Sequence, residues 1–202
     1  LCYMINMSFV RNHSLWRKNK QQNFSKLQKK NKKVFIFNGM KAKTKNDFAY
    51  IKRGEDLNCH KTFLNSHRKP WYKIEGKEPA PIMVAVFNRS RLKVVRNELL
   101  IYALTAFHGI YMEDRGGRDY TNILFCYLLT TIGQSILFES KREYGDGLGK
   151  FEPGDLNAAR ILDFDCLSDE DYSQIELIYQ ALTDENLEEK KVKLQEIFMQ
   201  YL

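Results

Sequence analysis

An apolar segment between Arg118 and Ser140 constrains the fold more than any other feature of the sequence. It reads "RDYTNILFCYLLTTIGQSILFES", and its length and leucines are typical of a helix that lies inside a protein core. The segment is long enough to cross a bilayer, but threonine, asparagine, glutamine and serine side chains interrupt it and charges close both of its ends. We therefore predict a long buried helix near residues 120–138, and no membrane span.

Short apolar runs before this segment predict strands. Val34–Phe37 ("VFIF") is one such run, and Asn38-Gly39 ends it with a turn signal. Ala80–Asn88 is almost continuously apolar and is bounded by prolines and polar residues, while residues 91–111 supply one or two further strands. The basic stretch "KAKTKND" between these runs has the composition of a linker. These strands predict a small mixed sheet.

Two helix starts are visible near the carboxyl end. Ser168 precedes three consecutive acids, which is the pattern of an N-cap followed by a first turn that complements the helix dipole. A second helix is expected to begin at Thr183 or Asp184. The predicted class is therefore α+β: a small mixed sheet, a long buried helix, two C-terminal helices and a basic N-terminal arm.

Charge is unevenly distributed along the 202 residues. Residues 1–50 carry twelve Lys or Arg against one acid, a net +11, whereas residues 163–202 carry three against eleven, a net −8. This asymmetry favours a polyanionic partner that binds the basic half, and nucleic acid is the commonest polyanion. Alternatively, residues 1–50 are a basic disordered leader on an ordinary protein. We divide the chain into a basic arm at 1–50, partly disordered or left from a missing domain, a central domain at 51–165, and an acidic helical segment at 166–202.

The cysteines and histidines indicate neither a disulfide framework nor a metal site. The four cysteines, Cys2, Cys59, Cys126 and Cys166, include no CxxC pair. Three of the four histidines, His60, His67 and His108, do not have the spacing of metal ligands. No signal peptide is readable at the amino end. We expect a reducing, cytoplasmic compartment, and because the chain begins with Leu1 we also expect it to be a fragment of a longer protein.

Glu143–Leu156, "EYGDGLGKFEPGDL", has the glycine content of a phosphate-binding loop but not its spacing. A Walker loop needs GxxxxGK and then a hydroxyl residue, whereas Gly145 and Gly149 are one residue too close and Phe151 replaces the hydroxyl. The GxGxxG pattern also fails, because Lys150 occupies the place of the third glycine. We predict an irregular loop whose glycines allow positive φ or close backbone approach.

A nuclease site is one alternative. Asp119 and Glu139 would have to share a hard cation while Lys141 steadied the attacking water. That arrangement needs Glu139 and Lys141 on a strand, but the run "ILFESK" has the pattern of a helix end.

Residues 65–81, "NSHRKPWYKIEGKEPAP", interleave cations with aromatic rings, namely Arg68, Lys69, Trp71, Tyr72 and Lys73. Cations neutralise phosphates and planar rings stack on bases, so this mixture suits a nucleic-acid surface. Alternatively, the two rings anchor a core and the lysines are solvated. A second basic edge consists of Arg89, Arg91, Lys93 and Arg96. If Leu92 and Val94 face the core, strand alternation places Arg91 and Lys93 on the other face.

Taken together, these stretches resemble a known family. "RKPWYKIEGKEPAPIMVAVFNRSRLKVVRNE", then "TAFHGIY", then the glycine loop, is similar in content and order to the carboxy-terminal part of adenine-N6 DNA methyltransferases of restriction-modification systems. The resemblance covers roughly residues 51–165. It implies a target-recognition domain that docks on duplex DNA, while a separate domain binds S-adenosylmethionine and flips the adenine.

The sequence lacks the catalytic half that whole proteins of this family carry. That half carries an Asn-Pro-Pro-Tyr type motif and a glycine-rich cofactor loop, and the four prolines here, Pro70, Pro79, Pro81 and Pro153, include no adjacent pair. We expect no cofactor bound by this chain, no methyl transfer by it alone, and DNA as its partner, with a separate catalytic domain or subunit as a second partner. An interaction module that pairs with such a subunit is the other alternative.

By position, the resemblance implies a set of DNA-contacting residues. They are Arg68, Lys69, Trp71, Tyr72, Lys73, Arg89, Arg91, His108 and Lys150, with Gly145, Gly147 and Gly149 shaping the loop.

Overall fold

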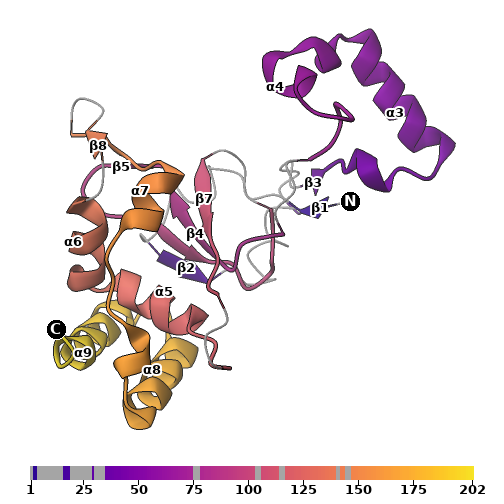
Figure 1. Ribbon diagram of the computed structural model, residues 1–202. Coiled ribbons are helices and arrows are strands. Elements are labelled where there is room, and N and C mark those ends of the chain that lie inside the picture. The colour runs from indigo at the N-terminus through magenta and orange to yellow at the C-terminus, as the bar shows by residue number, and fades with distance from the viewer. Residues whose placement is uncertain are drawn as a thin grey trace.

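Figure 1 shows the chain as a computed structural model. The structure describes residues 2–3, 16–18, 29, 35–74, 78–102, 106–113, 117–139, 142–143 and 147–202. Most of the basic arm expected at 1–50 lies outside these residues, as do Gly145 and Lys141.

A four-stranded mixed sheet forms the centre of the molecule. Its strands, in order across the sheet, are β2 (Trp16–Lys18), β6 (Val94–Arg96), β4 (Ile82–Ala85) and β7 (Phe107–Ile110). β2 is parallel to β6 and the other pairs are antiparallel, so the prediction of a small mixed sheet is confirmed. The two shorter sheets consist of β1 (Cys2–Tyr3) with β3 (Phe35–Ile36), and of β5 (Phe87–Asn88), β9 (Gly149–Lys150) and β8 (Arg142–Glu143).

The apolar run Ala80–Asn88, expected to be one strand, contributes to two sheets. β4 ends at Ala85 and β5 begins at Phe87, and Val86 joins them. The backbone N–H of Val86 donates to the carbonyl of Ala106, while its own carbonyl accepts from Phe151 N, both at 3.0 Å. The chain therefore changes sheets at Val86 without losing backbone hydrogen bonds.

The main core surrounds α5 (Thr121–Leu129), which lies between the sheet and the two C-terminal helices (Figure 1). Eight of its nine residues are buried, including Phe125, Tyr127 and Leu128. A helix that is covered on all sides has to be apolar on all sides, which is why this segment resembles a membrane span in its sequence. Within the described part of the chain, no helix is both long and apolar enough to cross a bilayer.

The prediction of one long helix at 120–138 was wrong in one respect: the segment is broken at Thr130 into α5 and α6 (Thr131–Glu139). Thr130 is extended, and its hydroxyl accepts from Gly133 N at 3.1 Å, as an N-cap does. A Cβ on Gly133 would lie 2.1 Å from the Tyr127 carbonyl oxygen. The hydroxyl cap and the missing side chain together allow the second helix to start close beside the end of the first.

The two C-terminal helices are confirmed as α8 (Asp169–Ala181) and α9 (Leu187–Met199). Ser168 caps α8, its hydroxyl accepting from Asp171 N at 3.1 Å. The expected start of the last helix at Thr183 or Asp184 was wrong, because Thr183 and Asn186 cap one another through their side chains at 2.8 and 3.3 Å and hold a turn. The helix begins only after that turn.

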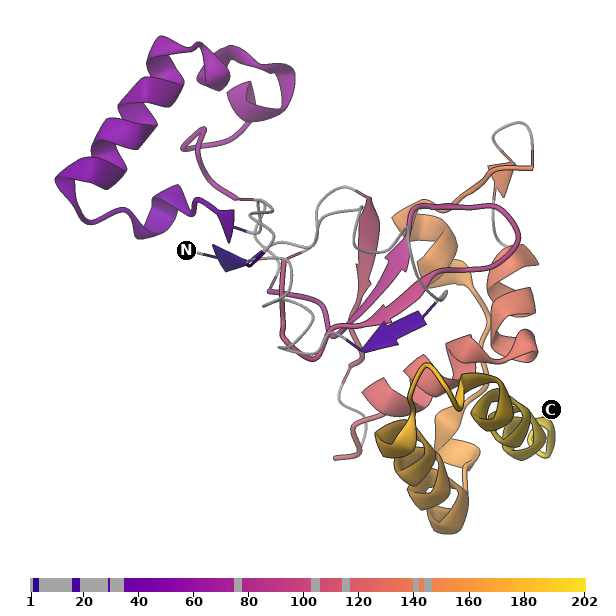
Figure 2. The same cartoon turned by 180° about the vertical axis from the view of Figure 1, so that it is seen from behind.

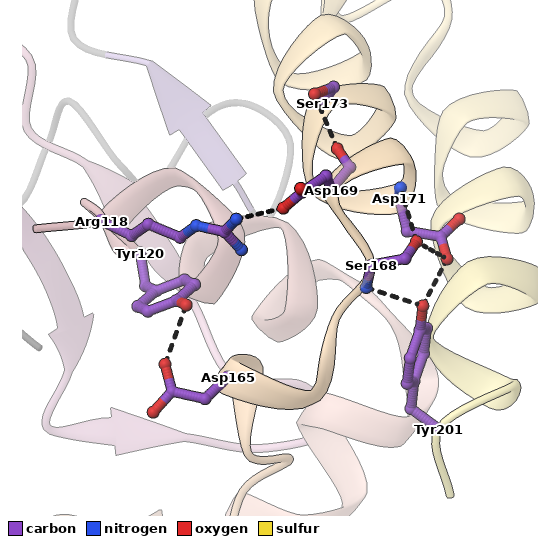
Figure 3. Close-up of polar contacts among 8 residues, drawn as sticks. All are labelled: Arg118, Tyr120, Asp165, Ser168, Asp169, Asp171, Ser173 and Tyr201. Carbon is purple, nitrogen blue, oxygen red and sulfur yellow. Dashed lines mark hydrogen bonds and ion pairs between the residues drawn. The ribbon is translucent and has the colours of Figure 1, made fainter. Parts of the chain in front are cut away.

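Polar contacts hold the beginning of α8 in place (Figure 3). The backbone N–H of Ser168 donates to the Tyr201 hydroxyl at 3.1 Å, and the same hydroxyl donates to the carboxylate of Asp171. On the other side, Arg118 forms an ion pair with Asp169. The residues at the start of α8 thus contact both the chain just after α9, at Tyr201, and the chain that leads into α5, at Arg118.

A helical unit, which we define as residues 39–73, stands apart from the central sheet in both views (Figures 1 and 2). It contains η1 (Gly39–Lys41), α3 (Lys45–Asp56), η2 (Cys59–Lys61) and α4 (Phe63–Ser66). The interpretation of "KAKTKND" as a linker was wrong, because α3 begins inside it at Lys45. Thr44 and Asp47 form a reciprocal capping box there, at 3.2 and 2.9 Å.

Candidate nucleic-acid interface

Trp71 packs inside the helical unit, against α3. A Cβ on Gly54 would lie 2.4 Å from Cη2 of the indole, so the ring lies directly on the helix backbone. The indole Nε1 donates to Glu55 Oε1 at 3.4 Å, and the ring centroid lies 6.3 Å from that of His60. The ring therefore joins α3 to η2, as the core-anchor interpretation expects.

Tyr72 has a similar position on the other side of Trp71. Its ring lies 5.7 Å from the indole, edge to face, and a Cβ on Gly39 would be 2.5 Å from its Cδ2. Both rings are half-buried. Packing accounts for their presence, and DNA contact by Trp71 or Tyr72 stays a prediction.

The cations of the same stretch face outward. Lys69 and Lys73 are exposed, and Arg68 is half-buried with Nη1 donating to Asn65 Oδ1 at 3.3 Å. Over the whole helical unit, nine Lys or Arg stand against three Asp or Glu, a net +6. The unit is therefore the most cationic folded part that the structure describes.

The second basic edge lies in the turn between β5 and β6. Arg89 and Arg91 are exposed, and Leu92 and Val94 are buried. The predicted strand alternation is nevertheless not confirmed, because Leu92 precedes β6, which begins at Val94, and Val95 is buried as well. Asn88, which we did not single out in the sequence, shapes this turn: its buried amide donates to Ala85 O at 2.6 Å and accepts from the N–H of Lys93 at 2.9 Å.

The glycine loop has more regular structure than expected. Gly149 and Lys150 form β9, paired with both β5 and β8, and Pro153 starts a helix, α7 (Pro153–Ala158). Gly147 has φ +66°, in the left-handed region that glycine adopts without strain, so the prediction of positive φ is confirmed at this residue. From Gly147 onward, the loop is therefore held by strand pairing at β9 and by the capped start of α7.

Lys150, the cation of that loop, has an acidic neighbour. Its Nζ lies 2.6 Å from Glu152 Oε1. The hydrogen bond and charge of Lys150, with smaller contributions from Arg142 and His108, hold the pKa of Glu152 below its usual value. Any phosphate bound at Lys150 has to compete with Glu152.

His108 is a structural bridge in this arrangement. It lies on β7, and its Nε2 donates to the carbonyl of Phe151 at 2.8 Å, across 43 positions of sequence. Phe151 itself is fully buried. The ring therefore ties the edge of the central sheet to the segment that follows β9, close to Lys150 and Glu152.

A cleft of about 870 Å³ runs along β7, and nothing in the sequence pattern had indicated it. One wall is β7 with the three residues that follow it, to Glu113, and the other is formed by α7 and the chain that follows it, to Asp165. At its floor the Tyr120 hydroxyl donates to Asp165 Oδ1 at 2.8 Å (Figure 3). The stretch "FHGIY" forms part of the first wall, so the family resemblance was the only signal that pointed to this region.

The nuclease hypothesis gains no support from the geometry. Glu139 ends a helix rather than a strand, and Lys141 lies outside the described residues. The Asp119 carboxylate accepts from Thr121 N at 2.8 Å, and its hydrogen bonds to Thr121 lower its pKa. Among the described side chains, no group of three or more His, Cys, Asp or Glu could hold a metal ion.

Comparison with known proteins identifies the class. Residues 10–197 match the C-terminal domain of the type II methyltransferase M.Eco57I, and since this covers most of the chain, the chain belongs to that family. The resemblance to a methyltransferase carboxy-terminal part is thereby confirmed.

Two curated relatives show how large a share of a whole methyltransferase the chain matches. The type II methyltransferase M.AccI of Acinetobacter calcoaceticus is 41% identical over 160 residues, which are 79% of this chain and 30% of that protein. The type II methyltransferase M.XamI of Xanthomonas campestris pv. amaranthicola is 27% identical over 100 residues, 50% of this chain and 18% of that protein. The chain therefore spans less than a third of either relative. No solved structure matches it.

Proposed function

We propose that this chain is the DNA target-recognition portion of a site-specific adenine-N6 DNA methyltransferase of a restriction-modification system. The observation that carries the proposal is the family match over residues 10–197. Chemical support comes from the helical unit, with its net +6, and from the exposed Arg89 and Arg91. Cations of this density neutralise phosphates and position a protein on a duplex.

In this proposal the methyl transfer belongs to a separate domain. That domain binds S-adenosylmethionine and the flipped adenine, and this chain supplies docking and site selection in the cytoplasm. Lys69, Lys73, Arg89 and Arg91 are the contacts we propose for phosphates, because their side chains lie in exposed positions. Lys150 and Arg68 contribute less, since Glu152 and Asn65 bind them within the fold.

A pairing role with a separately encoded catalytic subunit is the second candidate. The exposed apolar side chains on the acidic helices favour it, for Leu177 on α8 is 65% exposed and Val192 on α9 is 59% exposed. The two functions are compatible, because these helices and the helical unit are different surfaces (Figure 1).

The test is DNA binding by the complete 202-residue chain. We expect binding to a random-sequence duplex pool that weakens linearly on a log-log salt plot, with a slope of about −0.9 per neutralised phosphate. Repeated selection from the pool should enrich one sequence. No detectable binding at low salt would overturn the recognition role and leave the pairing role. Methyl transfer from labelled S-adenosylmethionine by the chain alone would contradict the division of labour.

A further inference from the structure

Phe63 is the most exposed large apolar side chain of the helical unit, and Leu64 lies next to it. Phe63 is 80% exposed and Leu64 is 59% exposed, on the single turn of α4. Burying a phenyl ring that is so exposed to water against another apolar surface is favourable. Two adjacent apolar side chains this exposed on one turn indicate a contact surface, whereas a single exposed one would be ordinary.

The turn that carries them is held rigidly. Asn65 Nδ2 donates to Cys59 O at 2.9 Å, and the Thr62 hydroxyl donates to the same carbonyl at 3.0 Å. Behind the ring, His67 Nδ1 donates to Phe63 O at 2.6 Å, and the two rings lie 4.9 Å apart. Phe63 is therefore presented on a backbone that side-chain hydrogen bonds fix from both sides.

The surroundings of this turn are cationic. Lys61 precedes it, Arg68 and Lys69 follow it, and Lys61 and Lys69 are exposed. An apolar protein surface that covered Phe63 would also have to desolvate these neighbouring charges, at a cost that only a set of matching acids could offset. A duplex offers phosphates beside stacked bases, so it accommodates the cations and the apolar side chains together.

We propose that Phe63 and Leu64 form an apolar wedge that enters the DNA duplex between neighbouring base pairs, while the flanking cations hold the phosphates. Proteins that insert such side chains unstack a base step and bend the duplex by about 20–90°. This inference rests on the proposed DNA-recognition function and adds a specific act to it.

The test uses the full chain and a random-sequence duplex with a fluorescence donor and acceptor at its two ends. We expect the wild-type chain to raise the transfer efficiency as it bends the duplex. Phe63→Ala should weaken binding by about tenfold, in line with the loss of one stacking contact, and should reduce the rise in transfer efficiency at saturating protein. Its salt slope should equal that of the wild type, because no charge is removed.

The matched control is Phe48→Ala. Phe48 lies on α3 of the same unit and is 56% exposed, but it is away from the turn, so this variant should bind and bend as the wild type does. Phe63→Trp keeps a planar apolar ring and should retain the bend. Because the residue is largely exposed, circular dichroism should show both variants at position 63 folded.

The outcomes separate the two proposals. If the wild type binds DNA and Phe63→Ala binds and bends it equally well, the wedge is overturned and the recognition function stands. An equal loss in Phe48→Ala and Phe63→Ala would also overturn the wedge, since it would show general stickiness of the unit. If the wild type does not bind even at low salt, the recognition function fails first and the wedge with it.

Discussion

The indole ring of Trp71 lies on the backbone of α3 at Gly54, where an added Cβ would be 2.4 Å from the ring atom Cη2. Real Cβ atoms do not approach other atoms this closely, so the position of the ring depends on a glycine seventeen residues before it in the chain. The two residues thus form one packing unit that connects α3 to the stretch carrying Lys69 and Lys73. Any DNA contact made by these lysines depends on that packing.

Gly54→Ala tests this relationship. In an exposed helix the change would stabilise by about 1 kcal/mol, but here the methyl group must displace a rigid ring, at roughly 1–3 kcal/mol. We expect a net loss of stability, measured by urea unfolding monitored by tryptophan fluorescence. The matched control is Gly154→Ala in α7, where an added Cβ meets nothing within 4 Å, and which should be neutral or stabilising. Equal behaviour of the two variants would show that the ring adapts freely.

Gly133→Ala tests the break between α5 and α6. The new Cβ would lie 2.1 Å from the Tyr127 carbonyl oxygen, a backbone atom that cannot rotate away. Relief requires one helix to move, so we expect a loss of roughly 3 kcal/mol in the free energy of unfolding, at the upper end for overpacking. Ser135→Ala, at an exposed position of the same helix, should stay within about 0.5 kcal/mol of the wild type. A stable Gly133→Ala would mean that the two helices can straighten into one.

Tyr179 makes stability depend on alkaline pH. Its hydroxyl donates to Glu98 Oε1 at 2.5 Å, and burial, then this hydrogen bond, raises its pKa well above the usual value. Below about pH 10 both the folded and the unfolded states hold the proton, so the contribution is complete. Above that pH the unfolded state releases the proton first, and the free energy of unfolding falls as pH rises.

Tyr179→Phe should remove part of this decline. The variant is expected to be less stable at neutral pH by about 1 kcal/mol, because it lacks the hydrogen bond, and to lose less stability than the wild type between neutral pH and the alkaline range. Chemical unfolding at a series of pH values measures both effects. Tyr50→Phe, at a residue that is 58% exposed, serves as the control and should follow the wild-type curve. A Tyr179→Phe curve parallel to the wild type would contradict the raised pKa.

The ion pair of Lys150 predicts an unequal share in DNA binding. Lys69→Ala should lower the magnitude of the log-log salt slope by about 0.9, the value for one phosphate contact. Lys150→Ala should lower it by less than half as much, because Glu152 lies 2.6 Å from its Nζ and competes for it. Lys193→Ala, on the C-terminal helix α9, should change nothing. A larger effect at Lys150 than at Lys69 would show that DNA displaces Glu152 and that the loop is the main phosphate site.

Features governed by neighbours in sequence could be predicted. Ser168 caps α8 through a residue three positions away. The burial of the segment that begins at Thr121 likewise follows from its composition. The family could be recognised because the resemblance rests on the order of motifs along the sequence, which does not depend on the fold.

What the sequence left open depends on contacts between distant residues. Whether Trp71 faced DNA or a core was decided by the α3 backbone at Gly54, and the break at Thr130 was decided by the approach of Gly133 to the Tyr127 carbonyl. Only the folded chain brings His108 to Phe151 and leaves Phe63 open to solvent. Composition and local spacing thus determined most of the helices and strands and the family. Tertiary packing decided which aromatic rings are buried in the core and which are exposed, because burial depends on neighbours from remote parts of the chain.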